Sequence, residues 1–367
     1  MQINIKNKPR QIQKIGLGLF ILLGIIPGCI TPFTPKNFNH ESKIVIEGLI
    51  TDKYEPYTVK LSRLAPMAAL KVIPISDATV FITDEFGEVF NFNESDSGIY
   101  VSDPDLLQGE IGRSYQLTVE TTNGNIYQSG FSEILAGPAI DSLYARRETI
   151  YNPNTQITTD GYQFYVKTQP SAEKNNYYMW SNITTYEYDV AFSIDYVYQG
   201  YQIPFSDPDS LKTCWKTEQG SNISIIHNDP EINTGSLTVG FFHDHISKFN
   251  IKYSLLLKQY AIDKETYIFY NELKKLNDNQ GSFYDQQPYQ IKGNLRNVND
   301  STEVIPGYFR VASVKEQRLF LNDSSYPQAF CLPYEGSARR LYFYSPSLWP
   351  FYVSTEGYLA NETCFDC

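Results

Sequence analysis

Asp77-Ala78-Thr79-Val80-Phe81-Ile82-Thr83-Asp84 is the stretch of sequence that decides the fold. Ala78, Val80 and Ile82 recur at every second position, and alternate side chains of a β-strand share one face of a sheet. The stretch therefore predicts a half-buried strand. Asn123-Gly124, further along, is a strong signal for a tight hairpin turn. Six other short segments around this stretch have a strand pattern: residues 44–50, 57–61, 89–92, 98–101, 114–119 and 126–127.

Seven short strands at this spacing predict an antiparallel β-sandwich over residues 42–136. Their order resembles the carboxypeptidase-regulatory-like, or transthyretin-like, module. That resemblance implies an immunoglobulin-like scaffold without catalysis of its own, and it implies no ligand. The residues that carry it are Ala78, Val80, Ile82, Asp84, Gly87, Gly98, Tyr100, Gly112, Tyr115, Leu117, Val119 and Gly124.

Ala136-Gly137-Pro138-Ala139 interrupts the strand pattern, so we place a domain boundary there. Residues 140–367 then form a larger β-rich domain. We interpret residues 191–212, which Pro and Asp punctuate, as a long loop. The sequence thus predicts a mainly β protein in two domains. Strands of the second domain are expected at residues 143–145, 162–166, 177–190, 223–227, 237–242, 251–260, 308–314 and 318–321.

Only one segment, near residues 263–277, has a helical period, with Phe269, Leu273 and Leu276 on one stripe. Asp263 is a good N-cap, and Ile262 can pack from outside the first turn as a hydrophobic staple. We therefore expect the second domain to carry a single α-helix, docked on a sheet by that stripe.

The chain's N-terminal segment ends in Ile26-Pro27-Gly28-Cys29 and carries four basic and no acidic residues before Cys29. The apolar run of residues 15–26 is shorter than the ~20 residues of a membrane span. A small residue before a cysteine is typical of a bacterial lipoprotein signal. We expect cleavage after Gly28, acylation of Cys29, and a tether over residues 29–41. Residue 30 is Ile rather than the Asp of inner-membrane retention, which favours the outer membrane and leaves the leaflet open.

Charge limits the class of partner. The chain has a net charge of −11, and residues 30–367 alone carry −15. Nucleic-acid binding needs a basic surface, so we expect no nucleic-acid partner. Four histidines and three methionines supply little material for metal or redox chemistry, and no cofactor is expected.

Four cysteines follow Cys29, namely Cys214, Cys331, Cys364 and Cys367. An even number in an oxidising envelope predicts two disulfides, and the sequence leaves all three pairings open. Cys364 and Cys367 have the spacing of a redox CxxC motif, but no helix follows them to stabilise a thiolate. A structural disulfide is the favoured interpretation.

His243 and His245 are the weak candidates for metal ligands, because residues i and i+2 of a strand share a face. No spacing singles out a third ligand, so a polar loop is the favoured interpretation. The sequence has no Gly-x-Ser-x-Gly turn and no phosphate-binding loop, and it distinguishes no carboxylate pair. We expect no catalytic residues and a protein that is not an enzyme.

The polar stretch of residues 281–297 is the candidate binding loop. Its amides, one carboxylate and tyrosines could bind a sugar or a peptide backbone, or they could satisfy one another inside an ordered loop, which is the favoured interpretation. The candidate residues are Tyr284, Asp285, Gln287, Tyr289, Gln290, Asn294 and Asn297.

This region and the helix before it resemble the Bacteroidota outer-membrane lipoprotein family called domain of unknown function 4249. The resemblance implies an outer-membrane setting, commonly beside TonB-dependent receptors, and implies no substrate. Glu47-Gly48-Leu49 and Cys214-Trp215 also fit it. The other residues that carry it are Tyr253, Gln259, Tyr260, Gly281, Ser282, Asp285, Gln287, Pro288, Gln290, Gly293, Asn294, Asn297, Gly307, Tyr308, Phe309 and Ala312.

We therefore expect a lipid-anchored outer-membrane protein that binds or scaffolds, as an accessory of a TonB-dependent uptake system or of another outer-membrane complex. Two alternatives stay open. One is a metal-dependent envelope hydrolase that uses His243 and His245, and the other is an adhesin-like surface protein.

Overall fold

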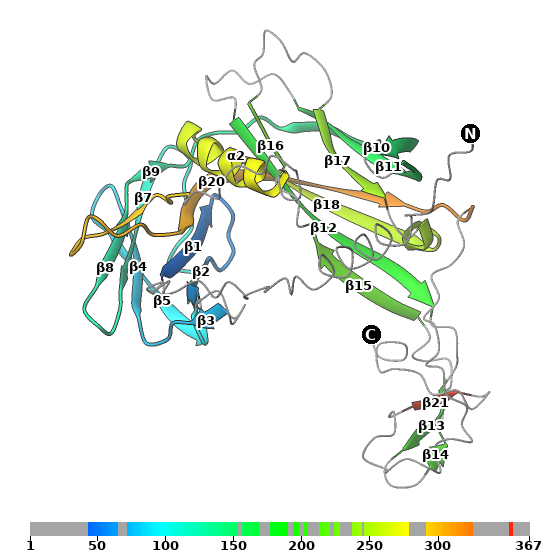
Figure 1. The fold of residues 1–367 in the computed structure, drawn as a ribbon, viewed down its shortest axis with the longest axis horizontal. Coiled ribbons are helices and arrows are strands. Elements are labelled where there is room, and N and C mark those ends of the chain that lie inside the picture. The colour runs from blue at the N-terminus through cyan, green and yellow to red at the C-terminus, as the bar shows by residue number, and fades with distance from the viewer. Residues whose placement is uncertain are drawn as a thin grey trace, which may run out of the picture. The chain divides into compact units, whose positions relative to one another are not determined.

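The computed structural model confirms a mainly β protein, with one α-helix in the part of the chain that it describes (Figure 1). No helix in that part is both long and apolar enough to cross a membrane. The described residues are 43–64, 72–152, 156–168, 177–189, 194–198, 202–204, 213–220, 224–227, 237–243, 246–278, 291–325 and 352–354.

The first half of the described chain forms an antiparallel sheet in the order β1-β2-β6-β5-β4-β7-β8, with β3 paired to β2 and β9 to β7. Each of the seven predicted segments overlaps one of its strands. The nine strands are β1 (Ile44–Thr51), β2 (Thr58–Leu64), β3 (Val72–Pro74), β4 (Thr79–Asp84), β5 (Val89–Asp96), β6 (Ile99–Ser102), β7 (Ser114–Glu120), β8 (Ile126–Ser129) and β9 (Ser132–Glu133).

The predicted alternation of β4 is confirmed. Val80 and Ile82 are buried in one core cluster, against which Ala78 packs, and Leu117 and Val119 of β7 lie in the same cluster. Burying a large aliphatic side chain contributes about 1.5–3 kcal/mol, so this repeated pattern stabilises the curled sheet around its core.

Local hydrogen bonds fix the turns of this sheet. The buried Asp84 carboxylate accepts hydrogen bonds from the backbone N–H groups of Phe86 and Glu88, at 2.9 and 2.8 Å, and pairs with Arg113. At the predicted hairpin, Gly124 has a φ of 83°, which glycine adopts without steric cost.

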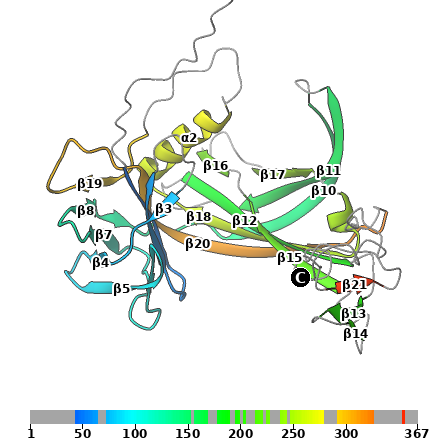
Figure 2. The same ribbon diagram turned by 60° about the horizontal axis from the view of Figure 1, so that its bottom comes forward.

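The second half has two layers around a core rich in aromatic side chains. The sheet β10-β11-β17 packs on the part of the large sheet ordered β15-β12-β18-β20, and both contribute to one cluster that contains Phe164, Trp180 and Leu255 (Figure 2). The strands are β10 (Ile140–Asn152), β11 (Ile157–Thr168), β12 (Tyr177–Asp189), β15 (Thr213–Gln219), β16 (Ser224–His227), β17 (Leu237–His243), β18 (Lys252–Ala261) and β20 (Gly307–Leu321), with the 3₁₀ helix η1 (Ile246–Phe249) before β18.

Two expectations for this half are corrected. Residues 191–212 are not a continuous loop, because β13 (Ile194–Tyr198) and β14 (Gln202–Pro204) pair there and β21 (Tyr352–Ser354) joins β13. The two strands predicted over residues 308–321 are one strand, β20, because its polar centre stays paired with β18 from Ser313 to Leu321.

Strands from beyond the predicted boundary also pair with the first half. β20 lies parallel to β1, from Gly307 opposite Ile46 to Ala312 opposite Thr51, and β19 (Leu295–Asn297) pairs with β8. The predicted division falls between β9 and β10, yet the hydrogen-bonded sheet is continuous across it.

The helix α2 (Lys264–Asp278) confirms the predicted segment. Asp263 Oδ1 accepts a hydrogen bond from the Thr266 N–H at 2.6 Å, the geometry of an N-cap. Ile262 is fully buried in an apolar cluster against which Tyr267 packs, as expected of a hydrophobic staple. Phe269 of the predicted stripe is buried, and its ring centroid lies 4.5 Å from that of Tyr308. The helix contacts β16 and β12 (Figure 1).

The segment between β9 and β10 is anchored to β18 by buried contacts. Gln259 accepts a hydrogen bond from the Trp180 indole N–H at 3.2 Å and donates one to the Pro138 carbonyl at 3.0 Å. Ser132 donates to the capping residue Asp263 at 2.8 Å. The segment predicted as a boundary is thus part of a satisfied polar network.

Candidate functional site

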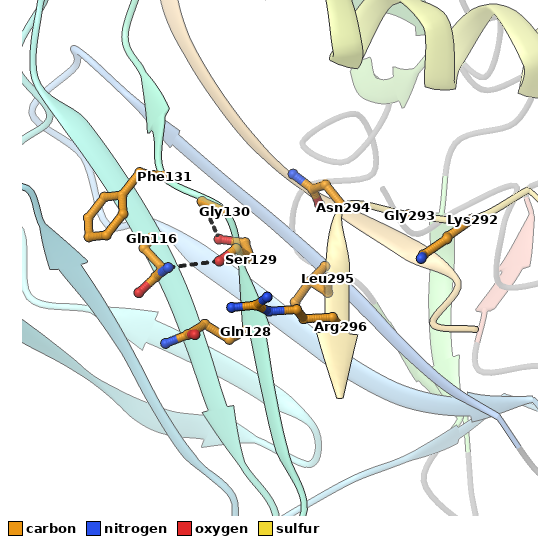
Figure 3. Close-up of a pocket in the computed structure, with 10 residues that line it drawn as sticks. All are labelled: Gln116, Gln128, Ser129, Gly130, Phe131, Lys292, Gly293, Asn294, Leu295 and Arg296. Carbon is orange, nitrogen blue, oxygen red and sulfur yellow. Dashed lines mark hydrogen bonds between the residues drawn. The ribbon is translucent and has the colours of Figure 1, made fainter. Parts of the chain in front are cut away.

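An open groove of about 470 Å³ lies where β7, β8 and β19 meet (Figure 3). Its volume is in the range of small-molecule sites, which measure about 300–1,000 Å³. The residues that line it are Gln116, Gln128, Ser129, Gly130, Phe131, Lys292, Gly293, Asn294, Leu295 and Arg296.

Sheet register brings three polar side chains of the groove to one face. Gln128 of β8 lies opposite Thr118 of β7 on one side and opposite Arg296 of β19 on the other. Gln116 is two residues before Thr118 and so shares its face. The sticks of Gln116, Gln128 and Arg296 lie along neighbouring strands in Figure 3.

Hydrogen bonds position the two amides. Gln116 Nε2 donates to the Ser129 carbonyl at 2.9 Å, and Gln128 Nε2 donates to Thr118 Oγ1 at 3.4 Å. The second of these contacts is long, so Gln128 is the more adjustable of the two side chains.

The wall that carries β19 is fixed by close backbone packing. Burial alternates along β19, with Leu295 and Asn297 in the core and Arg296 exposed. A Cβ atom at Gly293 would lie 1.8 Å from the Gly307 carbonyl oxygen, so only glycine allows this approach.

The chemistry of the groove is that of a hydrogen-bonding and cationic surface. Lys292 and Arg296 are exposed, Phe131 has 52% of its surface exposed, and none of the lining residues that the structure describes is acidic. No ion pair of either cation occurs within the described residues. The arrangement can donate hydrogen bonds, attract negative charge and offer one ring for stacking.

The structure describes two of the seven candidate loop residues. Asn294 lines the groove and makes two hydrogen bonds to the Phe309 backbone. Asn297 is buried, donates to Glu303 Oε2 at 2.6 Å and accepts from the Asn299 N–H at 2.8 Å. Both amides are thus used to hold the fold. Tyr284, Asp285, Gln287, Tyr289 and Gln290 lie outside the described residues, so a ligand-binding role for them stays a prediction.

The structure does not test the candidate pair of metal ligands, His243 and His245. His243 is the last residue of β17 and pairs with Gly161 of β11 through the backbone, and His245 lies outside the described part. Over the residues that the structure describes, no group of three or more His, Cys, Asp or Glu side chains could hold a metal ion.

The predicted lipidation site and disulfides are not tested by the structure. Cys214 lies in β15, opposite Tyr188 of β12, and its side chain is not described. Cys29, Cys331, Cys364 and Cys367 lie outside the described residues.

A second polar cluster surrounds Glu218 of β15. Its carboxylate accepts hydrogen bonds from Lys248 at 2.7 Å and from Tyr186 at 3.4 Å, and Lys216 lies 3.3 Å away. Burial would raise the pKa of Glu218, but the two lysines outweigh it and lower that pKa. Burial, with the negative charge of Glu218, raises the pKa of Tyr186 to about 12. A carboxylate that lysines neutralise in this way is part of a structural ion cluster, and its lowered pKa makes it a poor general base.

Sequence reasoning missed most of the groove. Gln116, Gln128 and Phe131 belong to the predicted scaffold. The only signal of the two glutamines is a polar residue at an outward strand position, and that of Phe131 is an aromatic residue in a turn between strands. Arg296 and Lys292 lie in the predicted loop but were not among its candidates. The groove exists only because β19 pairs with a strand about 170 residues earlier in the chain.

The model of a family described as a domain of unknown function (DUF4249) matches residues 30–318, which is most of the chain. The search of curated proteins found no match to this chain.

Proposed function

This chain belongs to the DUF4249 family, a domain of unknown function, and we propose that it is a non-enzymatic, lipid-anchored outer-membrane protein. Its role is that of a binding or scaffolding accessory of a TonB-dependent uptake system or of another outer-membrane complex. The observation that carries this proposal is the junction Ile26-Pro27-Gly28-Cys29 at the end of a basic and then apolar segment.

Acylation of Cys29 would give a stable anchor. Each buried methylene contributes about 0.8 kcal/mol, and one chain alone binds a membrane only reversibly. A lipoprotein cysteine carries more than one chain, so the protein stays on the membrane. The chain from residue 30 onwards is acidic, which suits a folded part that stands off an anionic lipid surface.

We also propose a Bacteroidota origin and a carboxypeptidase-regulatory-like module at residues 42–136. The curled sheet around one core and the tight hairpin at Gly124 support that module. Such a module supplies a rigid frame, and loops and grooves on rigid frames commonly carry recognition.

Binding is supported over catalysis by the chemistry of the groove. Its described side chains are amides, cations, the ring of Phe131, the buried Leu295, and Ser129, whose hydroxyl is hydrogen-bonded to the backbone of Leu117 and Gly130. The best-defined carboxylate cluster, around Glu218, lies elsewhere and is neutralised by lysines. Amides and cations recognise a ligand by hydrogen bonds and charge, without a nucleophile or an acid–base pair.

The anchor is tested by cell fractionation of the wild-type protein and of Cys29→Ser, with mass spectrometry of the N-terminal peptide. We expect the wild type in the outer membrane, beginning at an acylated Cys29, and the variant uncleaved or soluble. Equal detergent partitioning of the two proteins would refute the anchor. Stoichiometric zinc in the purified protein would instead favour a metal-dependent hydrolase.

A further inference from the structure

The charge of the groove is opposite to that of the chain around it. The chain has 41 acidic and 30 basic residues, yet the described lining residues of the groove include Lys292 and Arg296 and no acidic side chain. In an acidic protein, a concave site with one sign of charge raises the local concentration of ligands of the opposite sign. This groove therefore favours an anion.

The remaining side chains indicate what kind of anion. Gln116 and Gln128 present amide groups on the same face as Arg296, and amides donate to and accept from hydroxyl groups. The exposed ring of Phe131 lies at the same groove and offers a flat apolar surface (Figure 3). Few other apolar side chains line the site, so it suits a ligand covered with hydroxyl groups.

We propose that this groove binds an acidic sugar, with Arg296 on its carboxylate or sulfate group, Gln116 and Gln128 on its hydroxyl groups, Phe131 against its ring, and Lys292 adding positive charge at the other end of the groove. The inference rests on the proposed binding role and names its ligand class. A guanidinium matches the planar geometry of a carboxylate or a sulfate edge by paired hydrogen bonds.

An extended peptide is the less favoured ligand. A peptide could add a strand to the edge of β19 that pairs with no strand among the described residues, but β19 has only three residues and offers few backbone hydrogen bonds. Among the described lining residues, the only large apolar side chain that is exposed is Phe131, which gives an anchoring side chain of a peptide little to pack against.

The test is calorimetric titration of the purified folded chain with oligosaccharides of glucuronic acid, with sulfated oligosaccharides and with neutral oligosaccharides of glucose. We expect binding of at least one acidic set, weaker binding of the neutral set, and affinity that falls as salt rises. The two acidic sets distinguish a carboxylate from a sulfate ligand.

Three variants locate the site. Arg296→Gln and Lys292→Gln should each weaken binding roughly three- to tenfold, a modest factor because both cations are exposed and screened. Phe131→Ala should weaken every sugar that binds. Lys60→Gln, which removes an exposed cation of β2 outside the groove, is the charge control and should bind as the wild type does.

Thermal melts of all four variants should match the wild type, since each substituted side chain is exposed. Equal loss in Lys60→Gln and Arg296→Gln would overturn the proposal, because binding would then follow net charge alone. The proposal would also be overturned if none of the sugars bound, or if only an acidic peptide bound. Those results would leave the outer-membrane role intact, since membrane fractionation and partner capture test that role separately.

Discussion

Asn294 makes two hydrogen bonds to the backbone of a single residue, Phe309. Its Nδ2 donates to the Phe309 carbonyl oxygen at 2.7 Å, and its Oδ1 accepts from the Phe309 N–H at 2.9 Å. The side chain thus takes the place of a neighbouring strand beside β20. The next residue begins β19, which pairs with β8. One wall of the groove is therefore tied to both β20 and β8.

Asn294→Ala should lower the free energy of unfolding by about 1–3 kcal/mol, because the backbone groups of buried Phe309 lose their side-chain partner. Urea denaturation of the purified protein measures the change. Asn93→Ala, which truncates an exposed amide on β5, is the matched control and should be close to neutral. Equal stability of Asn294→Ala and the wild type would show that this pair does not hold the wall.

Gln259→Leu should destabilise the protein by about 2–4 kcal/mol. The substitution replaces the amide by an apolar side chain of similar size. It leaves the Trp180 indole N–H and the Pro138 carbonyl without this hydrogen-bond partner in a buried site. Gln219→Leu, at an exposed position of β15, is the matched control. If both variants melt together with the wild type, the network does not anchor the segment between β9 and β10.

Acid should weaken the contact between β20 and its neighbours through Glu316. Burial would raise the pKa of this carboxyl, but hydrogen bonds and charge from Lys53 and Lys258 outweigh it and hold the pKa below its usual range. A carboxyl with a lowered folded-state pKa stabilises the fold above its unfolded pKa, about 4.3 for Glu, and loses that effect as the pH falls through the folded value.

We therefore expect the stability difference between the wild type and Glu316→Gln to be largest near neutral pH and to shrink as the pH falls below about 4.3. Thermal or urea unfolding of both proteins between pH 7 and pH 3 measures it. A difference that stays constant across this range would contradict the role of the Glu316 charge.

The four cysteines after Cys29 should form two disulfides, each contributing about 2–4 kcal/mol. Thiol counting under denaturing, non-reducing conditions should find no free thiol among Cys214, Cys331, Cys364 and Cys367 in protein taken from the cell envelope. Reduction should lower the melting temperature. Four free thiols would refute this prediction and would favour a redox role for Cys364 and Cys367.

The sequence predicted those elements whose pattern lies within a few neighbouring residues. Val80 and Ile82 point into the core as their alternation predicts, and Asp263 caps α2 through the N–H of Thr266, as its place before the helical stripe predicts. These features depend on a strand period and on a side chain three residues from a backbone N–H. They need no information from distant parts of the chain.

Pairings between distant residues could not be predicted in the same way. Lys315 and Glu316 interrupt the apolar pattern, so residues 308–321 read as two strands, but Glu316 is paired with lysines and β20 continues. Arg296 faces Gln128 only because β19 joins β8. The groove is made by sheet register between segments far apart in sequence, which leaves no local pattern.

The central claim is that this protein works as an outer-membrane accessory, and capture of its partner tests that claim most directly. The full-length protein, tagged near its C-terminus, is purified from detergent-solubilised outer membranes and its companions are identified and quantified. A parallel purification uses the triple variant Tyr284→Ala, Gln287→Ala and Tyr289→Ala, whose fold is checked by a thermal melt. The account predicts a TonB-dependent receptor, or another outer-membrane protein, in near-stoichiometric amount with the wild type and less of it with the folded variant. Recovery of the wild-type protein alone, with no stoichiometric outer-membrane companion, would contradict the account.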